Sequence, residues 1–143
     1  MIKYYVNEEK RTVIAKFDVG QYSEREYWRR NILKEITKSS RLFYMFEDTE
    51  NQILNAALNR IDNNIYGVAK CSPDDMWDEE TGKALAKKRL LRKWKLACLA
   101  AFEVASNKFS NTLADINKKM YSLSSQLDKS KTQPGIEVNI HTN

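Results

Sequence analysis

The chain has 143 residues, 42% of them hydrophobic, and its 24 Lys and Arg against 19 Asp and Glu give a net charge of +5. This length suits a single domain with a buried core, and the composition argues against a disordered chain. No apolar run approaches the ~18 residues of a membrane span, and the N-terminus lacks the apolar region of a signal peptide. We therefore expect a soluble cytoplasmic protein without a membrane partner.

Alternating apolar residues near the N-terminus predict a β-hairpin. They fall in two runs separated by a polar turn: Ile2, Tyr4 and Val6, then Val13, Ala15 and Phe17. After Gly20, Ser23 and Glu26 match a capping box, with Tyr22 and Tyr27 at the positions of a hydrophobic staple. This pattern predicts the start of a helix.

The predicted helix should run from about Glu24 to about Lys38. Trp28, Ile32 and Ile36 lie on one face of it at helical spacing. An apolar stripe of this kind is typical of an amphipathic helix that packs on a sheet.

The middle of the chain predicts two more strands and a second helix. Leu42 to Phe46 is a short apolar run typical of a strand, and Ile65 to Cys71 is another after the turn at residues 62–64. Between them, Thr49 with Gln52 offers another capping box. Five apolar residues then repeat at helical spacing: Ile53, Leu54, Ala57, Leu58 and Ile61. Cys71 is expected as a small buried apolar residue.

Two helix-start patterns precede a long helical segment, and the sequence leaves open which is used. Ser72-Pro73-Asp74-Asp75 combines a capping Ser, a Pro suited to the first helical position and early carboxylates. Asp78-Glu79-Glu80 is the second, with Gly82 as a possible break. From Lys83 neither Pro nor Gly occurs before Pro134, so a helix of about 45 residues, far above the average length, can reach residue 127.

The second half of this helix carries the heptad spacing of a coiled coil. The seam steps by three and four residues through Leu113, Ile116, Met120, Leu123 and Leu127. We expect a homo-oligomer in which these helices pack against copies of themselves; the alternative is an intramolecular helical hairpin that breaks near Ser106-Asn107. The predicted organisation is a single α+β domain over residues 1–127 and a polar tail over 128–143, where Ile136, Val138 and Ile140 alternate and suggest an edge strand. The fold class is a small antiparallel sheet with an N-terminal hairpin, packed by helices.

A dense cationic cluster opens the long helix. It contains no acid and consists of Lys87, Lys88, Arg89, Arg92, Lys93 and Lys95. Such a run usually forms a solvated face, but nearby Trp77 and the carboxylates of 78–80 favour recognition of phosphate by Arg forks with a base stacked on a ring. Trp94 lies among apolar neighbours and is expected in the core. Trp77, in a loop, is the stacking candidate.

The residues for catalysis or metal binding are sparse. The two cysteines lack CxxC spacing, and His141 is the single histidine. The carboxylates near residue 78 do not match an EF-hand and are explained by helix-start electrostatics. With four glycines and no phosphate-loop or nucleophile-elbow motif, we expect neither an enzyme nor a cofactor or metal site.

Two stretches carry a resemblance to a known family: IKYYVNEEKRTVIAKF at the N-terminus and GVAKCSPDDMWDEETGKALAKKRLL in the centre. They resemble the small phage proteins that counter the Thoeris immune system by sequestering its cyclic ADP-ribose signal. Members of that family bind the nucleotide without cleaving it, in pockets between subunits, and assemble through paired helices; some are also linked to capture of cyclic oligonucleotides. The resemblance covers about 40 residues and weakens between Gly20 and Asn64, which leaves ligand choice and the number of subunits open.

The resemblance implies a phage counter-defence protein that acts in the host cytoplasm. Its expected ligand contacts are Lys88, Arg89 and Arg92 for the diphosphate, Trp77 for adenine, and Asp78 or Glu79 for ribose hydroxyls. One alternative is a protein that binds nucleic acid or an acidic partner through Lys87 to Lys95, with affinity that falls steeply with salt. Another is a purely structural coiled-coil oligomer, in which neutralising Arg89 and Arg92 changes only solubility.

Overall fold

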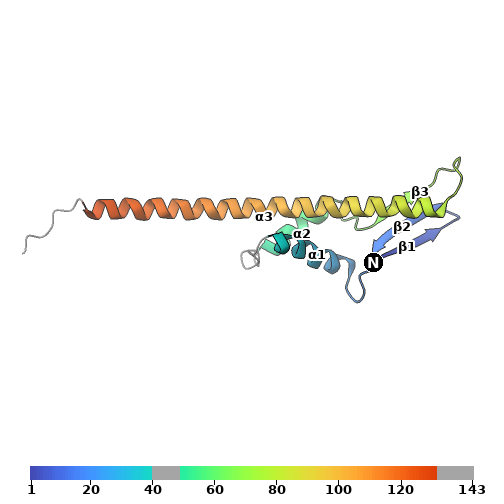
Figure 1. The fold of residues 1–143 in the computed structure, drawn as a ribbon, viewed down its shortest axis with the longest axis horizontal. Coiled ribbons are helices and arrows are strands. Elements are labelled where there is room, and N and C mark those ends of the chain that lie inside the picture. The colour runs from blue at the N-terminus through green and yellow to red at the C-terminus, as the bar shows by residue number, and fades with distance from the viewer. Residues whose placement is uncertain (40–48, 132–143) are drawn as a thin grey trace, which may run out of the picture. The chain divides into compact units, whose positions relative to one another are not determined.

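The structure is a computed structural model that describes residues 1–39 and 49–131. In chain order the described elements are β1 (Ile2–Asn7), β2 (Thr12–Phe17), α1 (Glu24–Ser39), α2 (Glu50–Asn59), β3 (Gly67–Lys70) and α3 (Glu79–Lys131) (Figure 1). This is the α+β fold that the sequence predicts. The chain divides into two compact units, Met1–Ser106 and Asn107–Asn143, and α3 contributes residues to both.

The three strands form one antiparallel sheet in the order β1-β2-β3. The predicted hairpin is confirmed, with Ile2 opposite Phe17 at one end and Asn7 opposite Thr12 at the other. Its turn closes through the Arg11 N–H, which donates to the Glu8 carbonyl at 2.9 Å. β3 pairs with β2 through four residues, so it is shorter than the predicted strand over residues 65–71.

One face of the sheet packs against the helices and contributes to the core of the first unit. Val13 and Ala15 are fully buried there, together with Trp28 of α1 and Leu90 of α3. The Trp28 and Trp94 rings meet edge to face with centroids 5.2 Å apart. Trp94 is partly buried and packs against the core, where the sequence predicts it.

Close backbone contact fixes β3 against α3. A Cβ added to Gly67 would lie 2.1 Å from the Ala86 carbonyl oxygen and 2.5 Å from the Leu90 nitrogen. Only glycine permits such an approach. As a result, the first turns of α3, including its cationic segment, lie directly beside β3 (Figure 1).

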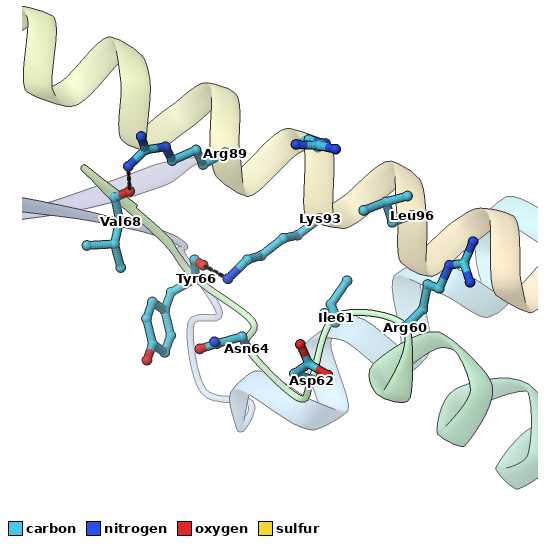
Figure 2. Close-up of a pocket in the computed structure, with 10 residues that line it drawn as sticks. Arg60, Ile61, Asp62, Asn64, Tyr66, Val68, Arg89, Lys93 and Leu96 are labelled. Atoms are coloured by element: carbon cyan, nitrogen blue, oxygen red, sulfur yellow. Dashed lines mark hydrogen bonds between the residues drawn. The ribbon is translucent and has the colours of Figure 1, made fainter. Parts of the chain in front are cut away.

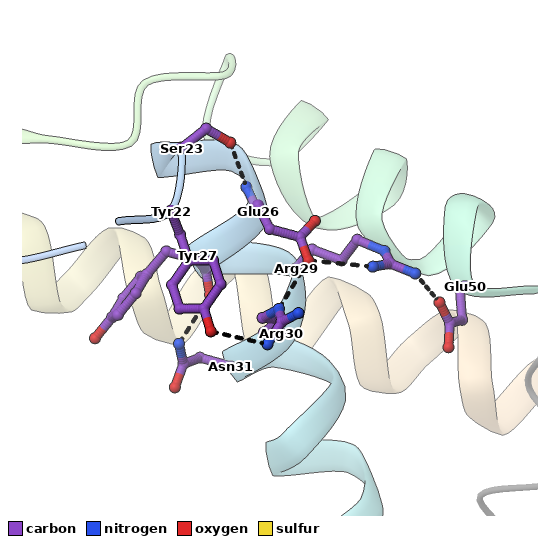
Figure 3. A network of polar contacts seen from close by, with 8 residues as sticks. All are labelled: Tyr22, Ser23, Glu26, Tyr27, Arg29, Arg30, Asn31 and Glu50. Carbon is purple, nitrogen blue, oxygen red and sulfur yellow. Dashed lines mark hydrogen bonds and ion pairs between the residues drawn. The ribbon is translucent and has the colours of Figure 1, made fainter. Parts of the chain in front are cut away.

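The predicted boundaries and inner face of α1 are confirmed, with one difference at its N-terminal cap. Trp28, Ile32 and Ile36 are buried, and the Glu26 N–H donates to the Ser23 hydroxyl at 3.2 Å. The Glu26 carboxylate, however, is engaged by arginines of its own helix instead of closing the box: Arg29 at 3.5 Å and Arg30 at 2.8 Å (Figure 3).

The two tyrosines at the expected staple positions contact other groups. The Arg30 guanidinium lies 4.5 Å from the Tyr22 ring centroid, and Tyr27 stacks on Phe17 at 5.7 Å. Arg29 also pairs with Glu50, which joins α1 to α2 (Figure 3).

The predicted apolar face of α2 is buried, but its expected cap is wrong. Thr49 occupies the N-cap position, yet its side chain is buried and makes no capping hydrogen bond. The turn after α2 uses the left-handed backbone at Asp62 and Asn63, with φ of 52° and 55°. The strand predicted at Leu42 to Phe46 lies outside the described residues.

Helix α3 uses the second of the two predicted starts. Asp78 caps it by accepting the Glu80 N–H at 3.1 Å, while the Asp75 N–H closes a turn on the Ser72 carbonyl at 3.3 Å. The helix runs for 53 residues without a break, so the hairpin alternative is wrong. None of the described helices is apolar over a stretch long enough to cross a bilayer.

The part of α3 from Asn107 onward exposes its predicted seam. Leu113 is 49% exposed, Met120 62% and Leu127 64%. The helix passes residue 127 and ends at Lys131; the rest of the predicted tail, with its suggested edge strand, lies outside the described residues. Self-association through the seam stays a prediction.

Candidate functional site

A cationic cleft of about 550 Å³ lies between α3, β3 and the turn after α2 (Figure 2). Its charged lining consists of the cations Arg60, Arg89, Arg92 and Lys93 and one carboxylate, Asp62. Tyr66 supplies the single aromatic ring of the lining. The volume falls within the range of small-molecule sites.

The edge of β3 positions two of these cations. Because β3 is an outer strand, its outward carbonyls have no strand partner among the described residues. Lys93 donates to the Tyr66 carbonyl at 2.8 Å, and Arg89 donates to the Val68 carbonyl at 2.5 Å (Figure 2). Ammonium has three N–H donors and guanidinium has five, so both groups keep donors for a ligand.

Ion pairs do not neutralise the positive charge of α3 between Lys87 and Lys95. The ion pairs among residues 1–39 and 49–131 use Lys3, Lys16, Lys38, Lys83, Arg29 and Arg30. None of the six cations from Lys87 to Lys95 takes part in them. A cleft with this excess of cations favours an anionic ligand.

Burial affects the ionisation of Lys93. Loss of hydration lowers the pKa of this ammonium, and the nearby Asp62 carboxylate opposes the shift in part. An anion bound beside Lys93 would favour its charged form and raise the pKa again. Anion binding beside Lys93 would therefore be coupled to its protonation.

Trp77 and Asp78 line a different cavity from Arg89 and Arg92. That cavity, of about 270 Å³, also includes Cys71 and shares no lining residue with the cationic cleft. The structure therefore does not bring the expected base-stacking residue together with the expected phosphate ligands.

Trp77 and Asp78, which line the smaller cavity, also have structural roles. Trp77 is half-buried and packs against the core. A hydrogen bond from the Thr81 hydroxyl, aided by the Glu80 N–H, holds the pKa of Asp78 below its usual value, since Asp78 caps α3. Glu79, the other expected ribose contact, pairs with Lys83 at 2.6 Å.

Arg11 holds the loop that carries this smaller cavity. Its guanidinium donates to the carbonyls of Pro73, at 2.6 Å, and Asp75, and lies 3.4 Å from the Cys71 sulfur. Cys71 is half-buried, where a buried residue was expected. These contacts tie the loop to the hairpin turn.

Lys88 faces a third hollow on the exposed side of α3. This hollow, of about 540 Å³, is also lined by Lys87, Leu91, Arg92 and Lys95. Arg92 lines both this hollow and the cationic cleft. Of the expected phosphate ligands, Arg89 and Arg92 thus share the cleft and Lys88 lies outside it.

Of the charged and aromatic residues that line the cleft, the expected ligand contacts included only Arg89 and Arg92. Arg60, Asp62 and Tyr66 come from the end of α2 and the segment before β3, and only the tertiary fold brings them to α3. The sequence did hold a signal for Lys93, which follows Arg89 by four residues and so lies on the same side of the helix.

Comparisons with known proteins return no relative. No protein-family model, curated protein or solved structure matches this chain. In the part of the chain that the structure describes, no group of three or more His, Cys, Asp or Glu side chains is arranged to hold a metal ion.

Proposed function

We propose that this chain binds a phosphate-bearing nucleotide of the cyclic ADP-ribose type in the cationic cleft and holds it without chemical change. The observation that carries the proposal is the cleft itself: four cations and one carboxylate around about 550 Å³, beside an aromatic ring. A diphosphate fits the donor geometry of paired guanidinium groups. The cleft volume suits a ligand of nucleotide size.

Within this proposal the phosphate ligands are Arg89 and Arg92, joined by Arg60 and Lys93 from the same lining. The hydrogen bonds of Arg89 and Lys93 to β3 support this role, because they fix both side chains before a ligand arrives. Trp77 and Asp78 would contact the nucleotide only if it extended beyond the cleft.

Sequestration of an immune signal in the bacterial cytoplasm is the biological role we propose. Its support is the resemblance of the two sequence stretches to the phage proteins that counter Thoeris. A protein of this kind is a binder, without a cofactor or a catalytic residue, and it acts by lowering the concentration of free signal. Capture of a cyclic oligonucleotide belongs to the same proposal, since its phosphates would need the same cations.

Titration calorimetry with cyclic ADP-ribose isomers, followed by heat release of the ligand and chromatography, tests this proposal. We expect tight binding of one isomer at a saturable site and recovery of that isomer intact. Arg92→Ala should weaken binding strongly, and Trp77→Ala should not. Recovery of a cleaved product, or no binding of any isomer, would refute the proposal.

Nucleic acid or an acidic protein is the second candidate ligand, favoured by the hollow on the exposed side of α3. Lys87, Lys88 and Lys95 line that hollow without ion pairs to other described residues. Binding there should tolerate many sequences and weaken steeply with salt, whereas the cleft should discriminate between isomers. A titration with short DNA or RNA at two salt concentrations separates the two functions.

We also propose that the protein self-associates through the seam from Leu113 to Leu127. These side chains are about half exposed or more, and they repeat at coiled-coil spacing. Counted back along the sequence, the exposed Phe109, Phe102 and Leu99 fall at the same heptad positions. A second copy of the chain presents a matching apolar seam.

A further inference from the structure

The sheet face that points away from the core carries an ordered set of side chains. Strand register places Tyr5 opposite Ile14, and Ile14 opposite Val68, so these three side chains form one row across all three strands. None of the three is buried, and Tyr5 is 55% exposed. Neighbouring strands lie about 4.8 Å apart, so the row spans about 10 Å, enough for the face of a purine.

Two of the three lysines beside this row, Lys3 and Lys16, are neutralised by ion pairs, whereas the exposed Lys70 of β3 takes part in none among the described residues. Lys3 pairs with Asp18 at 2.9 Å and Lys16 pairs with Glu24 at 2.8 Å. The Lys16 ammonium also lies 6.0 Å from the Tyr5 ring centroid and 5.5 Å from that of Tyr66. The row itself is therefore an aromatic and aliphatic surface, with one unpaired lysine beside its β3 end against four cations in the cleft.

The row and the cleft are continuous at β3. Val68 belongs to the row and also lines the cleft, and its carbonyl accepts the hydrogen bond from Arg89. Tyr66 likewise lines the cleft and contacts Lys16 on the open face. A ligand with a charged part and a flat uncharged part can therefore place one in the cleft and the other on the sheet.

We propose that Tyr5, Ile14 and Val68 form a base platform, on which the nucleobase of the bound nucleotide stacks while its phosphates occupy the cleft. This inference rests on the proposed function and assigns a second subsite to it. Sheet faces with exposed aromatic rings recognise unpaired bases in this way, because every base offers a π-face. The separation of neutral and cationic surfaces matches the separation of base and phosphates in a nucleotide.

Calorimetric titration of the full chain with cyclic ADP-ribose and with inorganic pyrophosphate tests the base platform. Tyr5→Ala should weaken cyclic ADP-ribose binding about tenfold and leave pyrophosphate binding within about twofold of the original protein. Tyr5→Phe keeps the ring and should bind both ligands normally. Tyr121→Ala is the matched control, since it removes a tyrosine that is 79% exposed on α3.

The other possible results of this titration distinguish failure of the base platform from failure of nucleotide binding in the cleft. Unchanged cyclic ADP-ribose affinity in Tyr5→Ala overturns the platform and leaves nucleotide binding in the cleft intact. Equal losses for both ligands also overturn it, because they indicate damage to the cleft. If the original protein binds neither ligand, the proposed function fails and the base platform fails with it.

Discussion

Lys93 is the residue whose environment would link the proposed ligand binding to pH. It is half-buried beside the Tyr66 ring, with its ammonium 5.3 Å from the ring centroid, and burial lowers its pKa. Burial makes the charged form less favourable than it is in water, and the charged form is the one that an anion needs. Anion binding would therefore take up protons when the pH lies above the pKa of Lys93 in the free protein.

We predict that affinity for cyclic ADP-ribose falls as pH rises through this lowered pKa, before ordinary lysines titrate. Below it, Lys93 is charged in both free and bound states, so affinity should be constant. Lys93→Arg keeps a charge at all these pH values and should extend strong binding to higher pH. Calorimetry over a pH series measures both profiles, and identical profiles would contradict the role of Lys93.

Cys98 provides a test of burial in the first unit. Burial raises the pKa of its thiol to about 11, so the reactive thiolate is scarce near neutral pH. In a Cys71→Ala background, alkylation by iodoacetamide at about pH 8 should be on the order of 100-fold slower in the folded protein than in urea. Equal rates in the two states would show that Cys98 is accessible.

At the scale of elements, the contact between β3 and α3 determines the shape of the cleft. Gly67 lets the two backbones touch, and Arg89 and Lys93 then reach the strand carbonyls. Any substitution that separates strand and helix should affect both stability and ligand binding.

We predict that Gly67→Ala lowers the free energy of unfolding by about 3 kcal/mol, because its Cβ meets rigid backbone atoms. It should also weaken nucleotide binding. Gly82→Ala is the comparison: its Cβ would meet the buried Val13 side chain at 2.7 Å, so it should cost less than the clash at Gly67, because a side chain and not backbone has to shift and alanine favours the helix. Urea denaturation measures both variants, and equal effects would contradict a backbone clash at Gly67.

Elements predicted from local sequence patterns are present in the structure, whereas choices that depend on tertiary contacts were not predicted. Alternation at Val13 and Ala15 and helical spacing at Trp28 and Ile32 are local signals, and the strands and helices that they predict are present. The choice between the two helix starts depends on a contact distant in sequence. Asp78, and not Ser72, caps α3, because the residues between them form a turn that Arg11 holds. Local pattern alone did not resolve such competition.

The candidate site was only partly predictable for the same reason. Arg89 and Arg92 stand out in a charged run, but Arg60 and Tyr66 join them only because Gly67 brings β3 onto α3. Trp77 was the expected stacking residue because it is a loop aromatic, yet it lines another cavity. The row of Tyr5, Ile14 and Val68 depends on the register of both strand pairs, and the sequence did not specify the register of β3.

At the scale of the whole molecule, the exposed seam predicts self-association. Replacing Leu113 and Ile116 together by Asp should convert the oligomer into monomers, because charges at seam positions oppose helix pairing. Tyr121→Asp, off the heptad seam, should leave the mass unchanged. Sedimentation equilibrium measures the masses; a monomeric original protein, or an unchanged oligomer in the double variant, would contradict the proposal.

The measurement that tests the central claim most directly compares two pairs of charge removals. One double variant, Arg60→Ala and Arg92→Ala, removes two cations of the cleft. The other, Lys87→Ala and Lys88→Ala, removes two cations from the exposed side of α3. In calorimetry with cyclic ADP-ribose at about 150 mM salt, the cleft pair should lose about 100-fold or more in affinity and the exposed pair less than about threefold. Equal losses, or a larger loss for the lysine pair, would contradict nucleotide binding in the cleft.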